Sequence, residues 1–163
     1  MRFLVQPVPD ALERARPPVR AFLVFAALLL VALVAHRAAQ GALSPEGLVH
    51  LLEPVPGERL GPLALWEEVH QGAFLYGFLL LMLGSLLVVC PVAPAVRAAL
   101  LGVGTAAALV DLLAPFLPLA WPGLPAWWAP LRIAGFAVAV AALLSSAGVA
   151  WATFGRPVGR GDG

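Results

Sequence analysis

The stretch GAFLYGFLLLMLGSLLVV, residues 72–89, decides the fold of this chain. Its 18 residues include no charged side chain. An α-helix needs about 20 consecutive apolar residues to cross the hydrocarbon core of a bilayer. The stretch therefore predicts a transmembrane helix.

Three other apolar runs accompany it. Residues 95–113 and 131–151 are also long enough to span, although Arg97 and Asp111 lie near the ends of the first of these runs. Residues 21–35 form a shorter run of 15, so a cleaved signal peptide is an alternative to a membrane helix there. We expect an uncleaved helix, because 20 residues that include acidic ones precede the run. Arg20, His36 and Arg37 at its borders can also extend to the membrane interface.

The composition is that of a membrane protein. Of the 163 residues, 61% are hydrophobic and 12% are charged, whereas soluble domains have about 45–50% and about 25%. We expect an all-α bundle of four transmembrane helices, at about residues 20–37, 66–90, 95–114 and 130–152. These helices form one domain, residues 21–152, between an N-terminal segment 1–20 and a tail 153–163. The lipid bilayer is the first partner that this predicts, and the net charge of +1 argues against nucleic acid.

The arginines predict the orientation of the bundle. Basic residues are enriched on the cytoplasmic side of membrane proteins, so we expect both termini in the cytoplasm and the chain in a bacterial inner membrane. Four tryptophans fall at the opposite, outer end, as an aromatic belt would. The inner arginines are Arg2, Arg14, Arg16, Arg20, Arg97, Arg156 and Arg160; the outer ones are Arg37, Arg59 and Arg132; the outer tryptophans are Trp66, Trp121, Trp127 and Trp128.

The segments between the predicted helices differ in kind. CPVAP, residues 90–94, contains two prolines that end a helix and predict a tight antiparallel hairpin. In SPEGLVHLLEP, residues 44–54, Ser44 is a candidate N-cap and Pro45 suits the first position of a short helix that lies on the membrane. The segment 114–130 is rich in proline and tryptophan, and we expect no regular helix there.

Three local features link the chain to known proteins. They are FLVQPVPDALERARPPVRAF at residues 3–22, SPEGLVHL at residues 44–51, and His70 at the start of the second predicted helix. In these features the chain resembles small, uncharacterised four-helix inner-membrane proteins of Gram-negative bacteria. The resemblance implies a topology and a location only.

Polar residues gather at the predicted outer end. The set contains all the histidines and most of the acidic residues: His36, His50, His70, Glu46, Glu53, Glu58, Glu67 and Glu68. Small residues mark packing faces in membrane helices, so we expect one face of the second predicted helix to point into the bundle and Glu68 to point elsewhere. The residues of this inward face are Glu67, His70, Phe74, Gly77, Leu81 and Gly84. The same argument predicts inward stripes on the next two helices: Arg97, Leu101, Gly104, Ala108 and Asp111, then Arg132, Gly135, Ala139, Ala142 and Ser146.

Asp111 lies about one turn inside the outer interface, and Arg132 begins the last predicted helix at a similar depth. A carboxylate within a membrane is costly unless it has a partner. We therefore predict a structural ion pair between Asp111 and Arg132. A functional role for this carboxylate is the alternative.

Glu67, His70, His36 and Tyr76 are candidate ligand-binding residues. The spacing Glu67-x-x-His70 also occurs in di-iron bundles, but there it occurs twice, and here it occurs once. His36 and His70 are placed to supply two axial ligands to a haem, and Tyr76 with His70 could bond a quinone. Haem or metal is thus an alternative to our expectation that His70 is the interfacial end of a membrane helix. The single cysteine, Cys90, excludes an intramolecular disulfide and a C-x-x-C site.

These patterns favour a non-catalytic function, because the sequence contains no H-E-x-x-H motif and no phosphate-binding glycine loop. We expect an accessory or assembly subunit of a larger membrane complex, bound to another membrane protein or to further copies of itself. The alternative is a redox-linked subunit that binds haem, metal or quinone at the outer His/Glu/Asp cluster. A transporter is disfavoured because no charged residue lies at mid-membrane.

Overall fold

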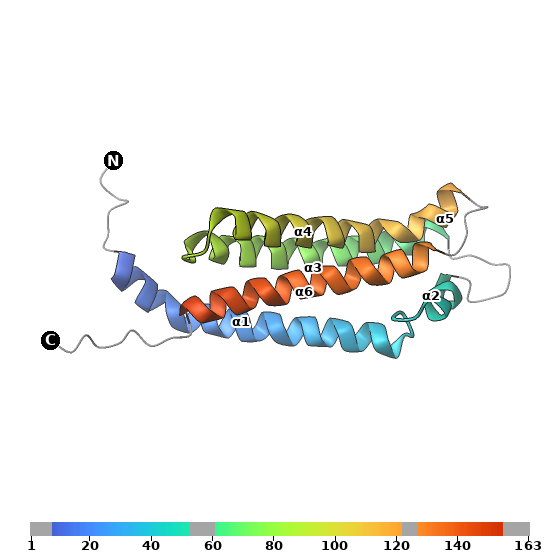
Figure 1. The fold of residues 1–163 in the computed structure, drawn as a ribbon. Helices are drawn as coiled ribbons and strands as arrows, with labels where there is room; N and C mark the ends of the chain where they lie inside the picture. Colours follow the sequence, from blue (N-terminus) through green and yellow to red (C-terminus); the bar gives the residue numbers. More distant parts are fainter. Residues whose placement is uncertain (1–7, 53–60, 122–126, 155–163) are drawn as a thin grey trace.

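The computed structural model describes residues 8–52, 61–121 and 127–154, and every regular element within these residues is helical (Figure 1). The long helices are α1 Val8–Ala39, α3 Pro62–Val89, α4 Pro94–Leu113 and α6 Trp128–Phe154. The short ones are α2 Pro45–Leu52, the 3₁₀ helix η1 Ala114–Phe116 and α5 Leu117–Ala120. Four spans are long and apolar enough to cross a membrane: Ala15–Ala39, Leu63–Val89, Pro94–Ala120 and Trp128–Phe154. The predicted all-α bundle of four transmembrane helices is confirmed.

Helix α6 is the centre of the bundle. It packs on each of the other three long helices and lies between α1 and the α3–α4 pair (Figure 1). Half of its most apolar window, 50%, is buried inside the protein, against 17% for the window of α1. Helix α1 is therefore the peripheral member of the bundle.

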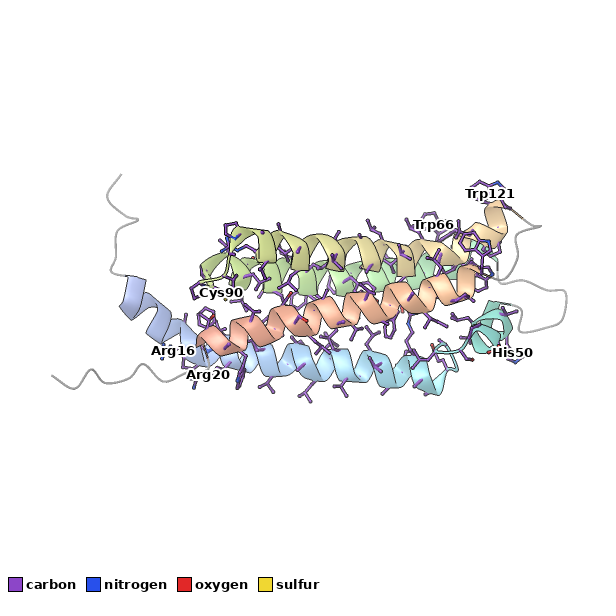
Figure 2. All side chains as sticks on the ribbon, in the orientation of Figure 1. Arg16, Arg20, His50, Trp66, Cys90 and Trp121 are labelled. Atoms are coloured by element: carbon purple, nitrogen blue, oxygen red, sulfur yellow. The ribbon has the colours of Figure 1, made fainter. Side chains whose placement is uncertain are left out.

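The bundle has two distinct ends. Arg16, Arg20 and Cys90 lie at one of them, which we call the hairpin end because the α3–α4 turn is there (Figure 2). His50, Trp66 and Trp121 lie at the other, which we call the α2 end. The predicted outer tryptophans Trp66 and Trp121 thus share an end.

Helices α4 and α6 approach closely because each has a glycine that faces the other helix. A Cβ added at Gly135 would lie 2.9 Å from the backbone nitrogen of Asp111, and one at Gly104 would lie 3.3 Å from the Cβ of Ala142. The inward stripes predicted for these two helices are confirmed, since their central members are buried: Gly104, Ala108, Asp111, Arg132, Gly135, Ala139, Ala142 and Ser146.

The predicted inward face of α3 is wrong except at Gly84, which is buried and packs on Leu101 of α4. Phe74 is 75% exposed, Leu81 is 69% exposed, and a Cβ added at Gly77 would meet nothing within 4 Å. Large side chains form most of the buried face: Leu65, Tyr76, Leu79, Leu83 and Leu87. A small residue therefore marks a packing face only where a neighbouring helix comes near, as at Gly84 and between α4 and α6.

Two helix ends also differ from expectation. Helix α1 begins at Val8 and passes through Pro17 and Pro18, so its first turns extend beyond the end of α6 (Figure 1). Past the other end of the bundle core, α4 continues into η1 and α5 despite Pro115 and Pro118. Pro115 and Pro118 each lie at the start of a short helix. A backbone N–H at that position would have no hydrogen-bond partner within the helix, so proline is tolerated there.

The capping predictions agree with the structure. The backbone N–H of Gly47 donates to Ser44 Oγ at 3.0 Å, and α2 begins at Pro45. Helix α2 then packs through Leu48, which is 1% exposed, onto a cluster that includes Leu65 and Trp128. Six residues named in the sequence predictions lie outside the described residues: Arg2, Glu53, Glu58, Arg59, Arg156 and Arg160.

Candidate functional site

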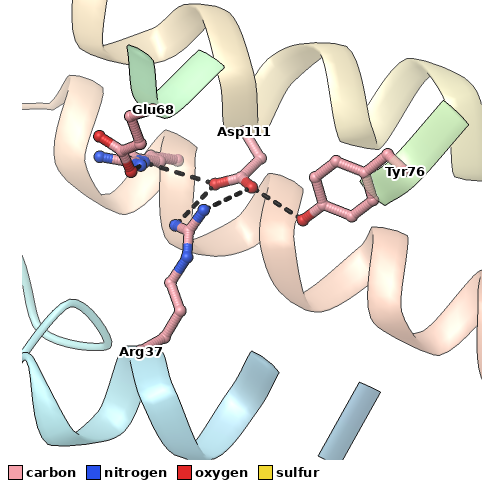
Figure 3. Close-up of polar contacts among 5 residues, drawn as sticks. Arg37, Glu68, Tyr76 and Asp111 are labelled. Atoms are coloured by element: carbon pink, nitrogen blue, oxygen red, sulfur yellow. Dashed lines mark hydrogen bonds and ion pairs between the residues drawn. The ribbon is translucent and has the colours of Figure 1, made fainter. Parts of the chain in front are cut away.

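Asp111 of α4 is the centre of a buried charge cluster (Figure 3). It is 0% exposed, and its carboxylate accepts hydrogen bonds from three side chains. Arg37 of α1 donates from Nη1 to Oδ1 and from Nη2 to Oδ2, both at 3.0 Å. Tyr76 of α3 donates its hydroxyl to Oδ2 at 2.8 Å, and Arg132 of α6 donates from Nε to Oδ1 at 3.4 Å. One carboxylate thus links all four long helices.

The packing of small residues places this carboxylate between helices. Gly135 lets α6 approach the backbone of Asp111, so the side chain cannot turn out to the bilayer and must be satisfied inside. Arg37 matches the carboxylate with a planar two-point fork, which is the strongest geometry for such a pair. Its guanidinium also lies over the ring of Phe136, 4.8 Å from the ring centroid.

The structure assigns Asp111 a different main partner from the one predicted. The contact with Arg132 is present, but it is one longer interaction, whereas Arg37 makes two shorter ones. Whether Asp111 and Arg132 are energetically coupled stays a prediction. The expectation that Arg37 reaches out to the interface is wrong, because this residue is 9% exposed.

Arg37 shares a face with the buried residues of α1. It follows Leu23, Ala26 and Leu30 at helical spacing, and these three residues are buried. Tyr76 is likewise in register with Leu79 of α3. The sequence does not single out these faces, because both helices are apolar on every side where they span the membrane.

Glu68 also belongs to the charge cluster and lies at its exposed edge. Arg132 donates from Nη2 to Glu68 Oε1, and the Glu68 side chain is 47% exposed. The prediction that Glu68 faces away from the bundle is therefore wrong, and Glu67 is exposed. Asp111 and Glu68 together balance the charges of the two arginines.

A pocket of about 430 Å³ opens beside this cluster, with walls from α1, α3 and α6. We call it the α1–α3 pocket. Its polar lining includes Arg37, Arg132, Glu67, Glu68, Gln71 and His36. Both buried arginines thus border a space large enough for a small polar group.

The predicted ligand-binding residues do not form one site. His36 lines the α1–α3 pocket, whereas His70 lines a shallower pocket of about 390 Å³ with Trp66, and Glu67 borders both. Tyr76 points to Asp111. Within the described residues, no three His, Cys, Asp or Glu side chains are grouped so that they could hold a metal ion. Ligand binding by these four residues stays a prediction.

Comparison with known proteins adds one result. A family model described as a transmembrane helical domain matches residues 58–157, a span that contains α3, α4 and α6. No curated protein and no solved structure gives a significant match. Together with the four apolar spans, the match identifies a multi-pass membrane protein. Asp111, Tyr76, Arg132 and Glu68 lie inside the matched residues, and Arg37 lies outside them.

Proposed function

The chain belongs to this transmembrane helical domain family, and on that premise we propose that it is a small accessory or assembly subunit of a larger membrane complex, without catalysis of its own. We place it in a bacterial inner membrane with both termini in the cytoplasm. The support for this placement is the sequence distribution of arginine, which is concentrated toward the predicted inner end.

The observation that carries the proposal is a groove between α4 and α6 on the exterior of the bundle. The groove has a volume of about 270 Å³, and its lining includes Ala99, Val103, Val138, Ala141 and Ser145. Small side chains let two helix backbones approach closely, and such approach is the main source of helix association in lipid. A transmembrane helix of a partner protein fits this groove.

The groove is also preorganised. Its walls belong to the two helices that Gly104 and Gly135 hold in close contact, so a partner helix meets a surface that is already formed. Binding to a rigid surface avoids the entropy cost of ordering it. Beside the groove, Gly102 and Gly148 face open space, which widens the region that a second backbone can approach.

Photo-crosslinking in native membranes tests this function. A photoreactive amino acid is introduced at Ala141 in the groove, and at Val24, an exposed α1 residue, as the matched control. We expect a crosslink to a larger membrane protein from position 141 and not from position 24. Ala141→Leu fills the groove and should reduce co-purification of the same protein, whereas Val24→Leu should not.

Two outcomes would contradict the proposal. Equal crosslinking from both positions would indicate random encounters in the bilayer. A crosslinked product made of two copies of this chain would indicate a homo-oligomer instead of an accessory subunit.

The redox-linked alternative stays a hypothesis. It would use His36, Glu67 and His70 near the α2 end, with a haem, metal or quinone as the ligand. The absorption spectrum and metal content of the purified protein, compared with those of His70→Ala, test it directly. A Soret band or bound metal that is lost in the variant would favour this alternative over the accessory subunit.

A further inference from the structure

We propose that the α1–α3 pocket binds the head group of one phospholipid that carries both a phosphate and a primary amine. The proposal is independent of the α4–α6 groove, since the two sites share no lining residue. Its basis is the arrangement of charges around the pocket, the depth of the pocket along the membrane spans, and its apolar wall.

The buried part of the pocket lining has a surplus of positive charge. Arg37 and Arg132 are 9% and 4% exposed, and the buried carboxylate that they share is Asp111. In the cluster, the second positive charge is balanced by Glu68, whose side chain is 47% exposed and can move into water. A phosphate oxygen can replace Glu68 on Arg132, because guanidinium groups bind carboxylates and phosphates with the same fork.

The rim of the pocket has the opposite charge. Glu67 is exposed there, and Glu68 joins it once a phosphate has taken its place on Arg132. Two carboxylates beside a bound phosphate suit an ammonium group with N–H donors. They disfavour a head group whose only charge is negative, and a quaternary ammonium has no N–H to donate. The pattern therefore selects a primary amine.

The position of the pocket indicates a lipid as the source of this head group. Arg37 lies two residues from the end of the span Ala15–Ala39, and Glu67 lies four residues after the start of the span Leu63–Val89. The pocket is thus at the depth of lipid head groups. Leu33 and Leu75 also line it, one turn deeper along its span than Arg37 and two turns deeper than Glu67, respectively, where they can contact the first carbons of an acyl chain.

Native mass spectrometry of the full chain in mild detergent tests the proposal. The added compounds are phosphatidylethanolamine, phosphatidylcholine, phosphatidylglycerol and the soluble analogue glycerophosphoethanolamine. We expect one bound phosphatidylethanolamine per chain, with an affinity about fivefold higher than that of phosphatidylcholine. The soluble analogue should bind more weakly than the lipid because it lacks the apolar contact.

Three variants sharpen the test. Glu67→Gln removes one of the two rim carboxylates and should weaken the preference for the primary amine, without touching Asp111. Ala64→Phe places a large ring in the pocket lining and should reduce the binding of phosphatidylethanolamine. Glu46→Gln changes an exposed acidic residue of α2 that does not line the pocket, and should leave the preference unchanged.

Several results would overturn the proposal. Equal affinity for phosphatidylethanolamine and phosphatidylcholine would overturn it, because the rim carboxylates would then not distinguish the two head groups. A preference for phosphatidylglycerol would also overturn it, because this head group has no ammonium group for those carboxylates to bind. Equal binding of lipid and soluble analogue would replace the lipid with a small zwitterion. An undiminished amine preference in Glu67→Gln would also contradict it, and this variant still tests the proposal if Ala64→Phe does not fold.

Discussion

Replacing Arg37 should destabilise the bundle more than replacing Arg132. Arg37→Gln removes two hydrogen bonds of 3.0 Å from the fully buried carboxylate of Asp111. Removing one partner of a buried ion pair costs about 3–5 kcal/mol, and the position near the end of a span favours the lower value, about 3 kcal/mol. The loss arises because the carboxylate stays buried without its main counter-charge.

The effect of Arg132→Gln should be smaller, about 1–2 kcal/mol. Its contact with Asp111 is 3.4 Å long, outside the usual range for a strong N–H···O hydrogen bond. Its other partner, Glu68, is 47% exposed, so water can solvate that carboxylate when the arginine is absent. The comparison therefore separates a desolvated pair from a partly solvated one.

A double-mutant cycle measures the two couplings. Asp111→Asn is combined with Arg37→Gln and, separately, with Arg132→Gln, and unfolding is followed by circular dichroism in mild detergent. We expect a coupling of about 2 kcal/mol or more for Asp111 with Arg37, and less than about 1 kcal/mol for Asp111 with Arg132. Additive losses for the first pair, or a larger coupling for the second, would refute the assignment of Arg37 as the main partner.

Three further predictions concern stability and topology. Tyr76→Phe removes the 2.8 Å hydrogen bond to the buried carboxylate and should lower the free energy of unfolding by about 1–2 kcal/mol. Gly135→Ala places a Cβ 2.9 Å from the backbone of α4 and should cost about 1–3 kcal/mol, whereas Gly77→Ala, with nothing within 4 Å, should be nearly neutral in the same unfolding assay. Alkaline phosphatase fused after Gly57 should be active and fused after Gly163 inactive, and the reverse activities would contradict the proposed orientation.

The sequence alone determined the membrane spans and some of their faces. A bilayer requires each crossing segment to satisfy its own backbone, so apolar runs of sufficient length become helices without help from the rest of the chain. The stripes of α4 and α6 were also predictable, because Gly104 and Gly135 allow a close approach that larger residues would block. The cap at Ser44 depends only on neighbouring residues, and it too follows from the sequence.

The tertiary structure decided which polar side chains meet. A membrane helix such as α3 is apolar on every side, so its sequence pattern does not fix its rotation about its own axis. That rotation is set by the neighbouring helices, and it turns Glu68 and Tyr76 toward the cluster while Glu67 lies at the exposed rim of the α1–α3 pocket. Arg37 depends on the same effect, since its partner Asp111 is 74 residues away and only the packing of α1 on α6 brings the two together.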